Sequence, residues 1–284
     1  MTTYHNLYLN ARGRLLGKCG DMAPLEARFM LMAASRKTQE ELLRDAALYA
    51  PDGTRRLFED MLNRRIDGEP LAYITGAWNF YGLPLTVSPD VLIPRTDTEP
   101  LAGAAIEHIR NDRPDGCRVL DLCTGSGCVA LAIAANAPGA QVTMLDADAA
   151  ALRVAKRNAR GLKLRVTAVM GDVLSPPRAV LGLYDLITCN PPYIPTDEIA
   201  SIDADVREYE PLKALDGGRD GMDFYRSLAR HWTAALKPGG VMMLEAGAGM
   251  LEQVRGLFSG MTVEGVIPDS GGIDRVLILQ NERG

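Results

Sequence analysis

Hydrophobic positions in the first 70 or so residues recur at the three- and four-residue spacing of amphipathic helices. The clearest run has apolar side chains at positions 57, 58, 61, 62 and 66, which share one face of a helix. Gly68 follows this run as a C-terminal cap. Thr38-Gln39-Glu40-Glu41 resembles a capping box that starts another helix. The pattern predicts a small helical bundle over residues 1–72.

Residues 73–95 have a different pattern. Aromatic and β-branched side chains alternate from Tyr73 to Val87 around Gly82-Leu83-Pro84. This alternation, interrupted by turn formers, is typical of a β-hairpin. We expect residues 73–95 to form a hairpin linker between two domains.

Apolar strand-like runs and helix-like runs alternate from about residue 116. Alternation of this kind is typical of a parallel sheet covered by helices on both faces. The expected strands are residues 118–122, 141–145, 166–170, 184–189, 241–244, 262–268 and 275–279, and the expected helices are residues 129–136, 149–160 and 222–236. Lys237-Pro238-Gly239-Gly240 is expected to end the last helix. We predict a doubly wound, mostly parallel α/β domain over residues 96–284.

Composition narrows the class of protein. The 284 residues include 31 basic and 36 acidic side chains, and residues 1–75 are close to neutral. This slight excess of acidic side chains argues against direct binding of nucleic acid through neutralisation of its phosphates. The five cysteines include no CxxC pair, and the three histidines have no partner at metal-ligand spacing, so we expect neither disulfides nor a metal. A polar N-terminus without a long apolar span indicates a cytoplasmic protein with no membrane contact, and we expect a monomer.

A glycine-rich turn follows the first expected strand of the second domain. The turn comprises Asp121, Leu122, Cys123, Thr124, Gly125, Ser126 and Gly127. Glycines here allow a ligand to approach the backbone and a helix to pack on the strand. The turn lacks the complete G-x-G-x-x-G spacing and a P-loop lysine, which disfavours a phosphate ligand.

Two acidic residues follow the next two strands. Asp146 lies about 20 residues after the glycine turn, where a carboxylate can accept hydrogen bonds from ribose hydroxyls. Asp172, followed by Val173, could accept from an adenine amino group. Taken alone, Asp146 would more often be a turn former or a helix cap, and a turn explains Asp172 nearly as well, but the glycine turn upstream favours ribose binding at Asp146. An adenosine pocket without phosphate recognition suits S-adenosylmethionine better than NAD or ATP.

The segment Asn190-Pro191-Pro192-Tyr193 directly follows the expected strand 184–189. Two prolines fix the chain just beyond the carboxyl end of that strand, which is the ligand-binding edge of a parallel sheet. The Asn190 oxygen can accept from a planar amide or amine, and the Tyr193 ring can pack on its flat face. A simple proline turn is the alternative, and the glycine turn upstream favours the binding site.

These motifs together resemble the class I S-adenosylmethionine-dependent methyltransferases that modify planar nitrogens. The segments 68–76, 91–95 and 274–276 extend the resemblance to the HemK-type glutamine methyltransferases of peptide chain release factors, over nearly the whole chain. Cys123 departs from the glycine common in that family, and Thr96-Asp97-Thr98-Glu99 replaces the commoner Pro-Glu-Thr-Glu. The resemblance implies a seven-stranded sheet, S-adenosylmethionine as cofactor, a glycine-glycine-glutamine loop as substrate, and substrate contacts from Arg95.

The expected chemistry is positioning of a weakly nucleophilic amide for in-line methyl transfer. We expect the Asn190 oxygen and the Pro191 carbonyl to accept the two amide hydrogens of the substrate, with Pro192 and Tyr193 beside it. Glu245, at the end of strand 241–244, either supports the site from behind or caps a helix.

Three other functions fit parts of the pattern. A DNA adenine methyltransferase would act on the exocyclic amine of adenine, which presents the same planar NH2 group as a glutamine amide. The excess of acidic over basic side chains disfavours this function. A ribosomal-protein glutamine methyltransferase would need the same site. A non-catalytic adenosine-binding protein would have no use for Asn190, so a cofactor-turnover assay separates it from an enzyme.

Overall fold

A computed structural model of the chain describes residues 2–113 and 116–282. The chain divides into two compact units. The helical unit comprises Met1–Ala77 together with Asp203–Tyr209, and the sheet unit comprises Trp78–Ile202 and Glu210–Gly284. The helical unit is therefore assembled from two separate stretches of sequence. Among the described residues, no helix combines the length and the apolar character needed to cross a bilayer.

The helical unit is built from short helices around one apolar core. They are α1 (Tyr4–Cys19), α2 (Ala23–Ser35), α3 (Gln39–Arg44), α4 (Asp52–Ile66) and α5 (Leu71–Thr75). The separate helix α9 (Ala204–Tyr209) belongs to the same unit but buries no side chain. Leu15, Ala27, Met30 and Leu62 are fully buried between α1, α2 and α4. Both hydrogen bonds of the capping box predicted at Thr38 are present, which confirms the start of α3.

The segment Tyr73–Thr75, expected to begin the hairpin, instead lies in the short helix α5. Pro70 precedes the helix, the Thr75 hydroxyl donates to the Leu71 carbonyl at 2.9 Å, and Gly76 ends it with φ +68°. Tyr73 and Ile74 are buried side by side in sequence, which a helix permits and a half-exposed strand does not. Tertiary burial therefore overrides the β-propensity of these side chains. The hairpin itself is β1 (Ala77–Phe80) and β2 (Leu83–Thr86).

The sheet unit contains a seven-stranded sheet of order β5-β4-β3-β6-β7-β9-β8. Its strands are β3 (Cys117–Leu122), β4 (Ala140–Asp146), β5 (Thr167–Met170), β6 (Tyr184–Cys189), β7 (Leu236–Glu245), β8 (Thr262–Pro268) and β9 (Asp274–Gln280). The first five of these pair in parallel, and β9 pairs antiparallel with β7 and β8. The predicted doubly wound, mostly parallel fold is confirmed.

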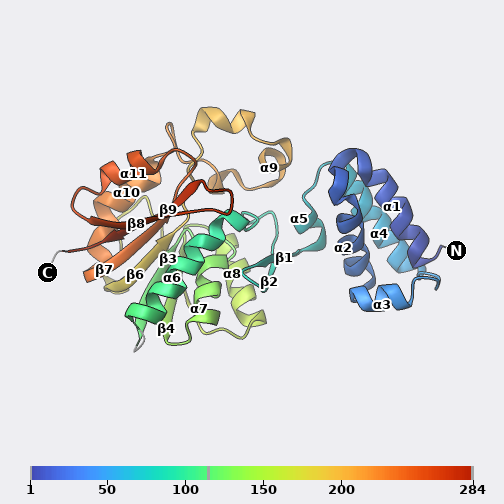
Figure 1. Cartoon of the computed structure of the whole chain (residues 1–284), viewed down its shortest axis with the longest axis horizontal. Coiled ribbons are helices and arrows are strands. Elements are labelled where there is room, and N and C mark those ends of the chain that lie inside the picture. Colours follow the sequence, from blue (N-terminus) through green and yellow to red (C-terminus); the bar gives the residue numbers. More distant parts are fainter. Residues whose placement is uncertain (1, 114–115, 283–284) are drawn as a thin grey trace. The chain divides into compact units, whose positions relative to one another are not determined.

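Helices cover both faces of this sheet (Figure 1). Helices α6 (Glu99–Asp112), α7 (Cys128–Asn136) and α8 (Ala149–Gly161) bury one face, and α10 (Asp223–Ser227) and α11 (Leu251–Leu257) bury the other. Strand β6 is buried along its whole length because both of its faces are covered. The carboxyl ends of β3, β4, β5 and β6 consequently meet at one edge of the sheet.

The single helix predicted over residues 222–236 is wrong. Helix α10 continues as one π-helical turn (Leu228–Trp232) and a 3-10 turn (Thr233–Ala235), and β7 already begins at Leu236. The Ser227 hydroxyl and the Trp232 indole both donate to the Val173 carbonyl, at 2.6 and 2.9 Å. In a π-helical turn, hydrogen bonds join residues five apart, so Ser227 and Trp232 lie near the same side of the helix and can both reach the Val173 carbonyl oxygen.

Candidate active site

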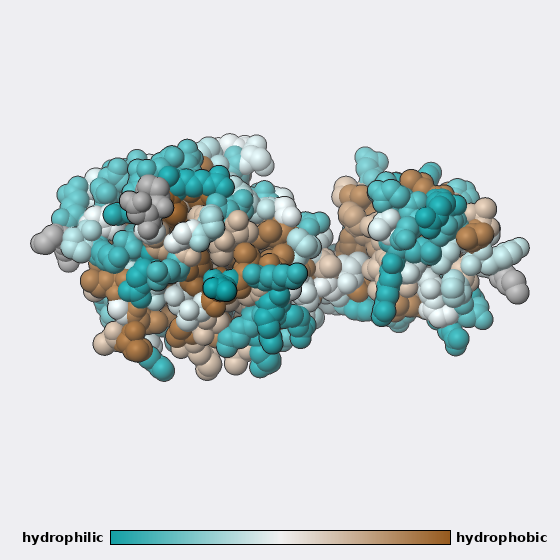
Figure 2. All heavy atoms as spheres, turned by 90° about the horizontal axis from the view of Figure 1, so that it is seen from below, coloured by the Kyte–Doolittle hydropathy of each residue, from teal (hydrophilic) through white to brown (hydrophobic). Residues whose placement is uncertain are grey.

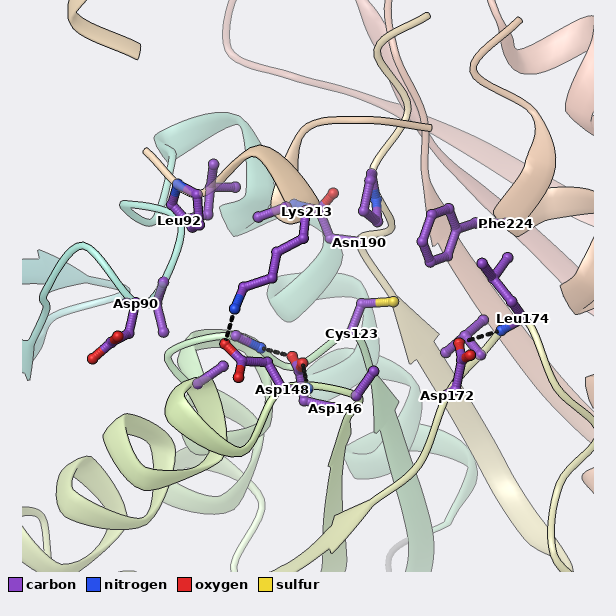
Figure 3. Close-up of a pocket in the computed structure, with 18 residues that line it drawn as sticks. Asp90, Leu92, Cys123, Asp146, Asp148, Asp172, Leu174, Asn190, Lys213 and Phe224 are labelled. Atoms are coloured by element: carbon purple, nitrogen blue, oxygen red, sulfur yellow. Dashed lines mark hydrogen bonds and ion pairs between the residues drawn. The ribbon is translucent and has the colours of Figure 1, made fainter. Parts of the chain in front are cut away.

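A cavity of about 400 Å³ opens at the carboxyl edge of the sheet (Figure 3). Its walls come from the ends of β3, β4, β5 and β6 and from two segments that follow β2 and precede α10. The lining residues include Asp90, Leu92, Cys123, Gly125, Asp146, Asp148, Asp172, Val173, Asn190, Pro192, Lys213 and Phe224. Mostly apolar walls with a few polar groups are typical of a cofactor site.

The glycine turn brings helix α7 close to the sheet. Gly127 has φ +83°, and a Cβ on it would lie 3.1 Å from Leu131 and 3.2 Å from the Met144 sulfur. A side chain here would therefore push α7 away from β4. Gly125 also has a positive φ, +52°, but no neighbour lies within 4 Å of its Cβ position. This open space beside the cavity leaves room for a ligand against the backbone.

Asp146 is fixed at the end of β4 by two backbone hydrogen bonds. One carboxylate oxygen accepts from the Gly125 N–H and the other from the Asp148 N–H, both at 2.9 Å. Burial raises the pKa of Asp146, and these two bonds oppose that shift. Each oxygen retains a lone pair for a ligand hydroxyl. The carboxylate is therefore a preorganised acceptor in the cavity wall, next to the glycine turn.

Sequence reasoning missed an ion pair beside this carboxylate. Lys213 forms an ion pair with Asp148, as Figure 3 shows. Asp148 also accepts from the Ala150 N–H at 2.9 Å and caps α8. The cap could be predicted from Asp148 preceding a helix, but nothing in the sequence indicated Lys213, which lies 65 residues away.

Asp172 follows β5 at the opposite wall. Its carboxylate accepts from the Leu174 N–H at 2.8 Å, the geometry of an aspartate turn, and its side chain faces the cavity (Figure 3). The turn and the ligand interpretations of Asp172 are therefore compatible. Val173 is buried, and its carbonyl is the oxygen held by Ser227 and Trp232.

Asp121 lies deeper than the other site residues. The residue is 2% exposed, and its carboxylate accepts from the hydroxyls of Thr124 and Thr188 at 2.5 and 2.7 Å. Burial raises the pKa of Asp121 to about 6. Together with Arg95, Thr98, Thr124 and Ser126 it lines a smaller pocket, which shares Cys123, Gly125 and Asn190 with the larger cavity.

A glycine-rich loop supports the Asn190–Tyr193 segment from behind. Ile194 exchanges backbone hydrogen bonds with Leu215 and Gly217, at 3.0 and 2.9 Å. A Cβ on Gly217 would lie 2.7 Å from the Tyr193 Cα, and one on Gly221 would collide with the Tyr193 carbonyl. Close backbone contact therefore sets the position of the segment. The run Asp216-Gly217-Gly218-Arg219-Asp220-Gly221 was the available sequence signal for this contact.

The variant segment Thr96-Asp97-Thr98-Glu99 lies beside Asn190. The Asn190 amide nitrogen donates to the Thr98 hydroxyl at 3.0 Å. Glu99 accepts from the Tyr81 N–H at 2.9 Å, and Asp97 pairs with Arg275 at 3.4 Å. The contacts of this segment thus connect the hairpin, the Asn190 segment and β9.

Glu245 is buried at the end of β7, next to the same groups. The register pairs Cys189 with Leu244, so Asn190 and Glu245 follow at adjacent strand ends. Burial raises the pKa of Glu245 to about 7, although Thr98, Arg275 and Asn190 lower it. Its Oε2 atom has no hydrogen-bond partner within the described part of the chain. Glu245 starts no helix, because α11 begins at Leu251.

Arg95 forms an ion pair with the buried carboxylate of Glu210. Glu210 also accepts from the Ile93 N–H at 3.1 Å, so it fixes the segment that carries Arg95. The Arg95 side chain is 40% exposed at the mouth of the smaller pocket.

The structure brings most of the predicted site residues together. Cys123, Gly125, Asp146, Asp172, Val173, Asn190 and Pro192 line the larger cavity, and Arg95, Asp121, Thr124 and Ser126 line the smaller pocket. Gly127, Pro191 and Tyr193 line neither. Gly127 starts α7, and Tyr193 packs against the core on the α10 face. No group of metal-binding side chains occurs among residues 2–113 and 116–282.

Two family models match this chain. The model of the methyltransferase small domain matches residues 102–203, and the model of the PrmC N-terminal domain matches residues 7–76. Apart from Asp203, the first match lies in the sheet unit, and the second match lies in the helical unit.

Curated relatives match over most of their length. The release factor glutamine methyltransferase of Thermodesulfovibrio yellowstonii is 40% identical over 79% of this chain and 81% of its own. The enzyme of the same name from Moorella thermoacetica is 41% identical over 89% of this chain and 90% of its own. Among solved structures, a methyltransferase from Pyrococcus furiosus superposes with a TM-score of 0.54 at 19% identity, covering 79% of this chain and 100% of its own. That last similarity concerns the fold alone.

Proposed function

This chain belongs to the release factor glutamine methyltransferases, and we propose that Asn190-Pro191-Pro192-Tyr193 holds the glutamine side chain that it methylates. The reaction transfers a methyl group from S-adenosylmethionine to the amide nitrogen of a glutamine in a peptide chain release factor. The observation that carries the assignment is the Asn190 amide, which lines both pockets and whose nitrogen donates a hydrogen bond to Thr98. Its oxygen consequently lies on the other side of the amide group, where a substrate N–H can donate to it.

The larger cavity fits the adenosine part of S-adenosylmethionine. Asp146 would accept from the ribose hydroxyls, Asp172 from the adenine amino group, and Val173 and Phe224 would border the base. The open backbone at Gly125 and the smaller pocket beside Asp121 and Thr124 would take the methionine part. When bound, the cofactor supplies an electrophilic sulfonium methyl group.

The residues around Asn190 supply position rather than acid–base chemistry. The Asn190 oxygen and the Pro191 carbonyl would accept the two amide hydrogens, which directs the nitrogen lone pair toward the methyl group. The same acceptors would stabilise positive charge that develops on the nitrogen. Tyr193 would pack on the planar amide, and its position is fixed by Gly217 and Gly221. The alkylated nitrogen is acidic and can lose its proton to water.

The helical unit is proposed to dock the body of the release factor. A glutamine on a glycine-rich loop offers little contact area, so affinity requires a second contact. Figure 2 shows hydrophobic residues at the surface of this unit among hydrophilic ones. The exposed large apolar side chains on α1, α2 and the turn between them are Leu9, Leu16, Met22, Leu25 and Phe29. We further propose a cytoplasmic monomer that contacts no nucleic acid directly.

Mass spectrometry of a candidate release factor tests this function. After incubation with enzyme and S-adenosylmethionine, we expect a gain of one methyl group on one glutamine, and the fragment spectrum locates it. A matched reaction with duplex DNA should give no methylated adenine. Methylation of DNA, or of no release factor, would contradict the proposal.

A further inference from the structure

One stretch of the sheet unit carries a concentrated positive charge. Residues 149–170, which run from α8 to the end of β5, include six basic side chains and no acidic one, in a chain whose formal net charge is −5. All six cations are exposed: Arg153, Lys156, Arg157, Arg160, Lys163 and Arg165. No ion pair within residues 2–113 and 116–282 involves any of them, so their charge faces solvent without a partner.

Four of these cations share the outer face of α8. Arg153, Lys156, Arg157 and Arg160 follow the spacing i, i+3, i+4 and i+7, which makes them neighbours on the helix surface. Like charges at these spacings destabilise a helix. Only Arg160 lies in the last turn, where a cation favours the helix dipole. The stability of α8 therefore does not explain this arrangement.

The basic face begins at the edge of the sheet where the larger cavity opens. Asp148, which caps α8, and Ala151 in its first turn both line the cavity. Figure 3 shows Asp148 beside the cavity at the start of this helix. The 13 residues of α8 extend for about 20 Å from this edge. A macromolecule that inserts a side chain into the cavity covers its rim, and it can continue from there onto the outer face of α8.

Resting on the proposed function, we propose that this basic face binds an acidic surface of the release factor while the substrate glutamine occupies the cavity. Guanidinium groups fit carboxylates through two parallel hydrogen bonds, and four of the six cations are arginines. The apolar side chains of α8 are buried in the core of the sheet unit, so the helix has no free apolar face to insert into a membrane.

Nucleic-acid phosphates share the chemistry of carboxylates, but two observations favour a protein partner. Residues 149–170 contain no aromatic side chain on which an unpaired base could stack. The macromolecule that brings a glutamine to the neighbouring cavity is itself a protein. Its contact with α8 would add to the proposed apolar contact on the helical unit, and two weak contacts at separate places strengthen binding together.

The test is the charge reversal Arg153→Glu/Arg157→Glu. Each new glutamate gains a cation three residues later, at Lys156 and Arg160, so the helix loses repulsion and thermal unfolding should show no loss of stability. We expect KM for a release factor to rise roughly tenfold at low salt, with kcat and the calorimetric Kd for S-adenosylmethionine within about twofold of the parent. Methylation of a short glycine-glutamine peptide should not change.

Salt supplies a second measurement. For the parent, kcat/KM with a release factor should fall as the salt concentration rises, because exposed charges are screened. For the charge-reversed variant the fall should be smaller. If the variant proves unstable, Arg153→Gln/Arg157→Gln takes its place, with an expected rise in KM of roughly threefold.

Arg230→Glu/Arg255→Glu is the matched control, because it makes the same change in charge at two exposed arginines in the helices that cover the other face of the sheet. An equal rise in KM in both variants, or no rise in the α8 variant, would overturn the inference. So would parental binding of an RNA duplex or of phosphatidylserine vesicles that the α8 variant loses, since the face would then serve that partner. A parent that methylates no release factor would instead remove the proposed function, and this inference with it.

Discussion

The Asn190 amide nitrogen lies 3.0 Å from the Thr98 hydroxyl oxygen, although the two residues are 92 positions apart in the sequence. The contact joins the end of β6 to the turn before α6, next to the buried Glu245. It shows which side of the Asn190 amide faces the protein interior, and the substrate contact proposed above uses the opposite side.

Replacing Asn190 by alanine should separate chemistry from cofactor binding. Loss of a preorganised acceptor costs about 2.7–4 kcal/mol in comparable sites, so we expect kcat to fall by roughly a hundredfold or more. The calorimetric Kd for S-adenosylmethionine should change by less than about threefold. Turnover close to the parental rate would contradict the proposed role.

Replacing Asp146 by alanine should weaken the cofactor directly. Charge-assisted hydrogen bonds are worth about 1.5–3 kcal/mol, so we expect the Kd to rise by roughly ten- to a hundredfold. Asp146→Asn keeps the shape and one acceptor and should lose less. Calorimetry on both variants checks the order, and parental affinity in Asp146→Ala would show that this carboxylate does not hold the ribose.

Gly221→Ala should disturb the active site more than Gly82→Ala. The two glycines have nearly equal φ angles of +73° and +75°, so each substitution introduces similar backbone strain, about 1–2 kcal/mol. Only at Gly221 does the new Cβ collide with the Tyr193 carbonyl, whereas nothing lies within 4 Å of the Gly82 position. We expect kcat to fall roughly tenfold or more in Gly221→Ala. Equal activities in the two variants would show that the glycine loop does not position Tyr193.

The stability of the protein should fall as pH rises from about 4.5 to about 7, in part because of Glu245. Burial raises its pKa from 4.5 to about 7 in the folded state. A raised pKa stabilises the fold fully below pH 4.5, and this contribution is lost as pH rises through 7. The loss is on the order of 3 kcal/mol. Asp121, raised from 3.8 to about 6, acts in the same direction.

Denaturant unfolding of the parent and Glu245→Gln at pH 5 and pH 8 measures this contribution. We expect the free energy of unfolding to decrease less with pH in the variant, because glutamine does not ionise. Parallel pH dependences would mean that Glu245 titrates near its ordinary value in the folded protein.

Substitution of exposed apolar residues on the helical unit should affect only whole release factors. Leu16 and Phe29 are 62% and 41% exposed. We expect Leu16→Ala/Phe29→Ala to raise KM for a release factor by roughly tenfold, because apolar anchors often contribute 1–2 kcal/mol or more. Methylation of a short glycine-glutamine peptide should not change. Val180→Ala on the sheet unit, where Val180 is 87% exposed, is the matched control.

The strands of the sheet unit could be predicted well because their residues form short apolar runs. The range predicted for β6, residues 184–189, agrees with the structure at both ends. The predicted β3 is one residue short at one end, and the predicted β4 is one residue short at each end. Helix α6 was not predicted, although Pro100 in its first turn is a usual signal for a helix start. The π-helical turn after α10 depends on the Val173 carbonyl, more than 50 residues away, so no local pattern could indicate it.

The site was predictable where it depends on strand ends and unpredictable where it depends on tertiary contacts. The places of Asp146 at the end of β4 and of Asn190 directly after β6 could be predicted from the strand pattern. Thr98, Lys213 and Glu210 contribute through partners that are 65 to 115 positions distant, at Asn190, Asp148 and Arg95. A single sequence carries no record of such pairs.

The helical unit is assembled from two separate stretches of sequence, and this affects experiments that cut the chain. Asp205 pairs with Arg65 and Lys18, at 3.3 and 3.4 Å. Residues 203–209 therefore belong to the helical unit, although the residues before and after them in the sequence belong to the sheet unit. Cleavage by a protease after Ala77 would sever one of three covalent crossings. We expect the two fragments to co-elute in gel filtration. A protein that begins at residue 78 would instead leave its segment 203–209 without the ion-pair partners Lys18 and Arg65.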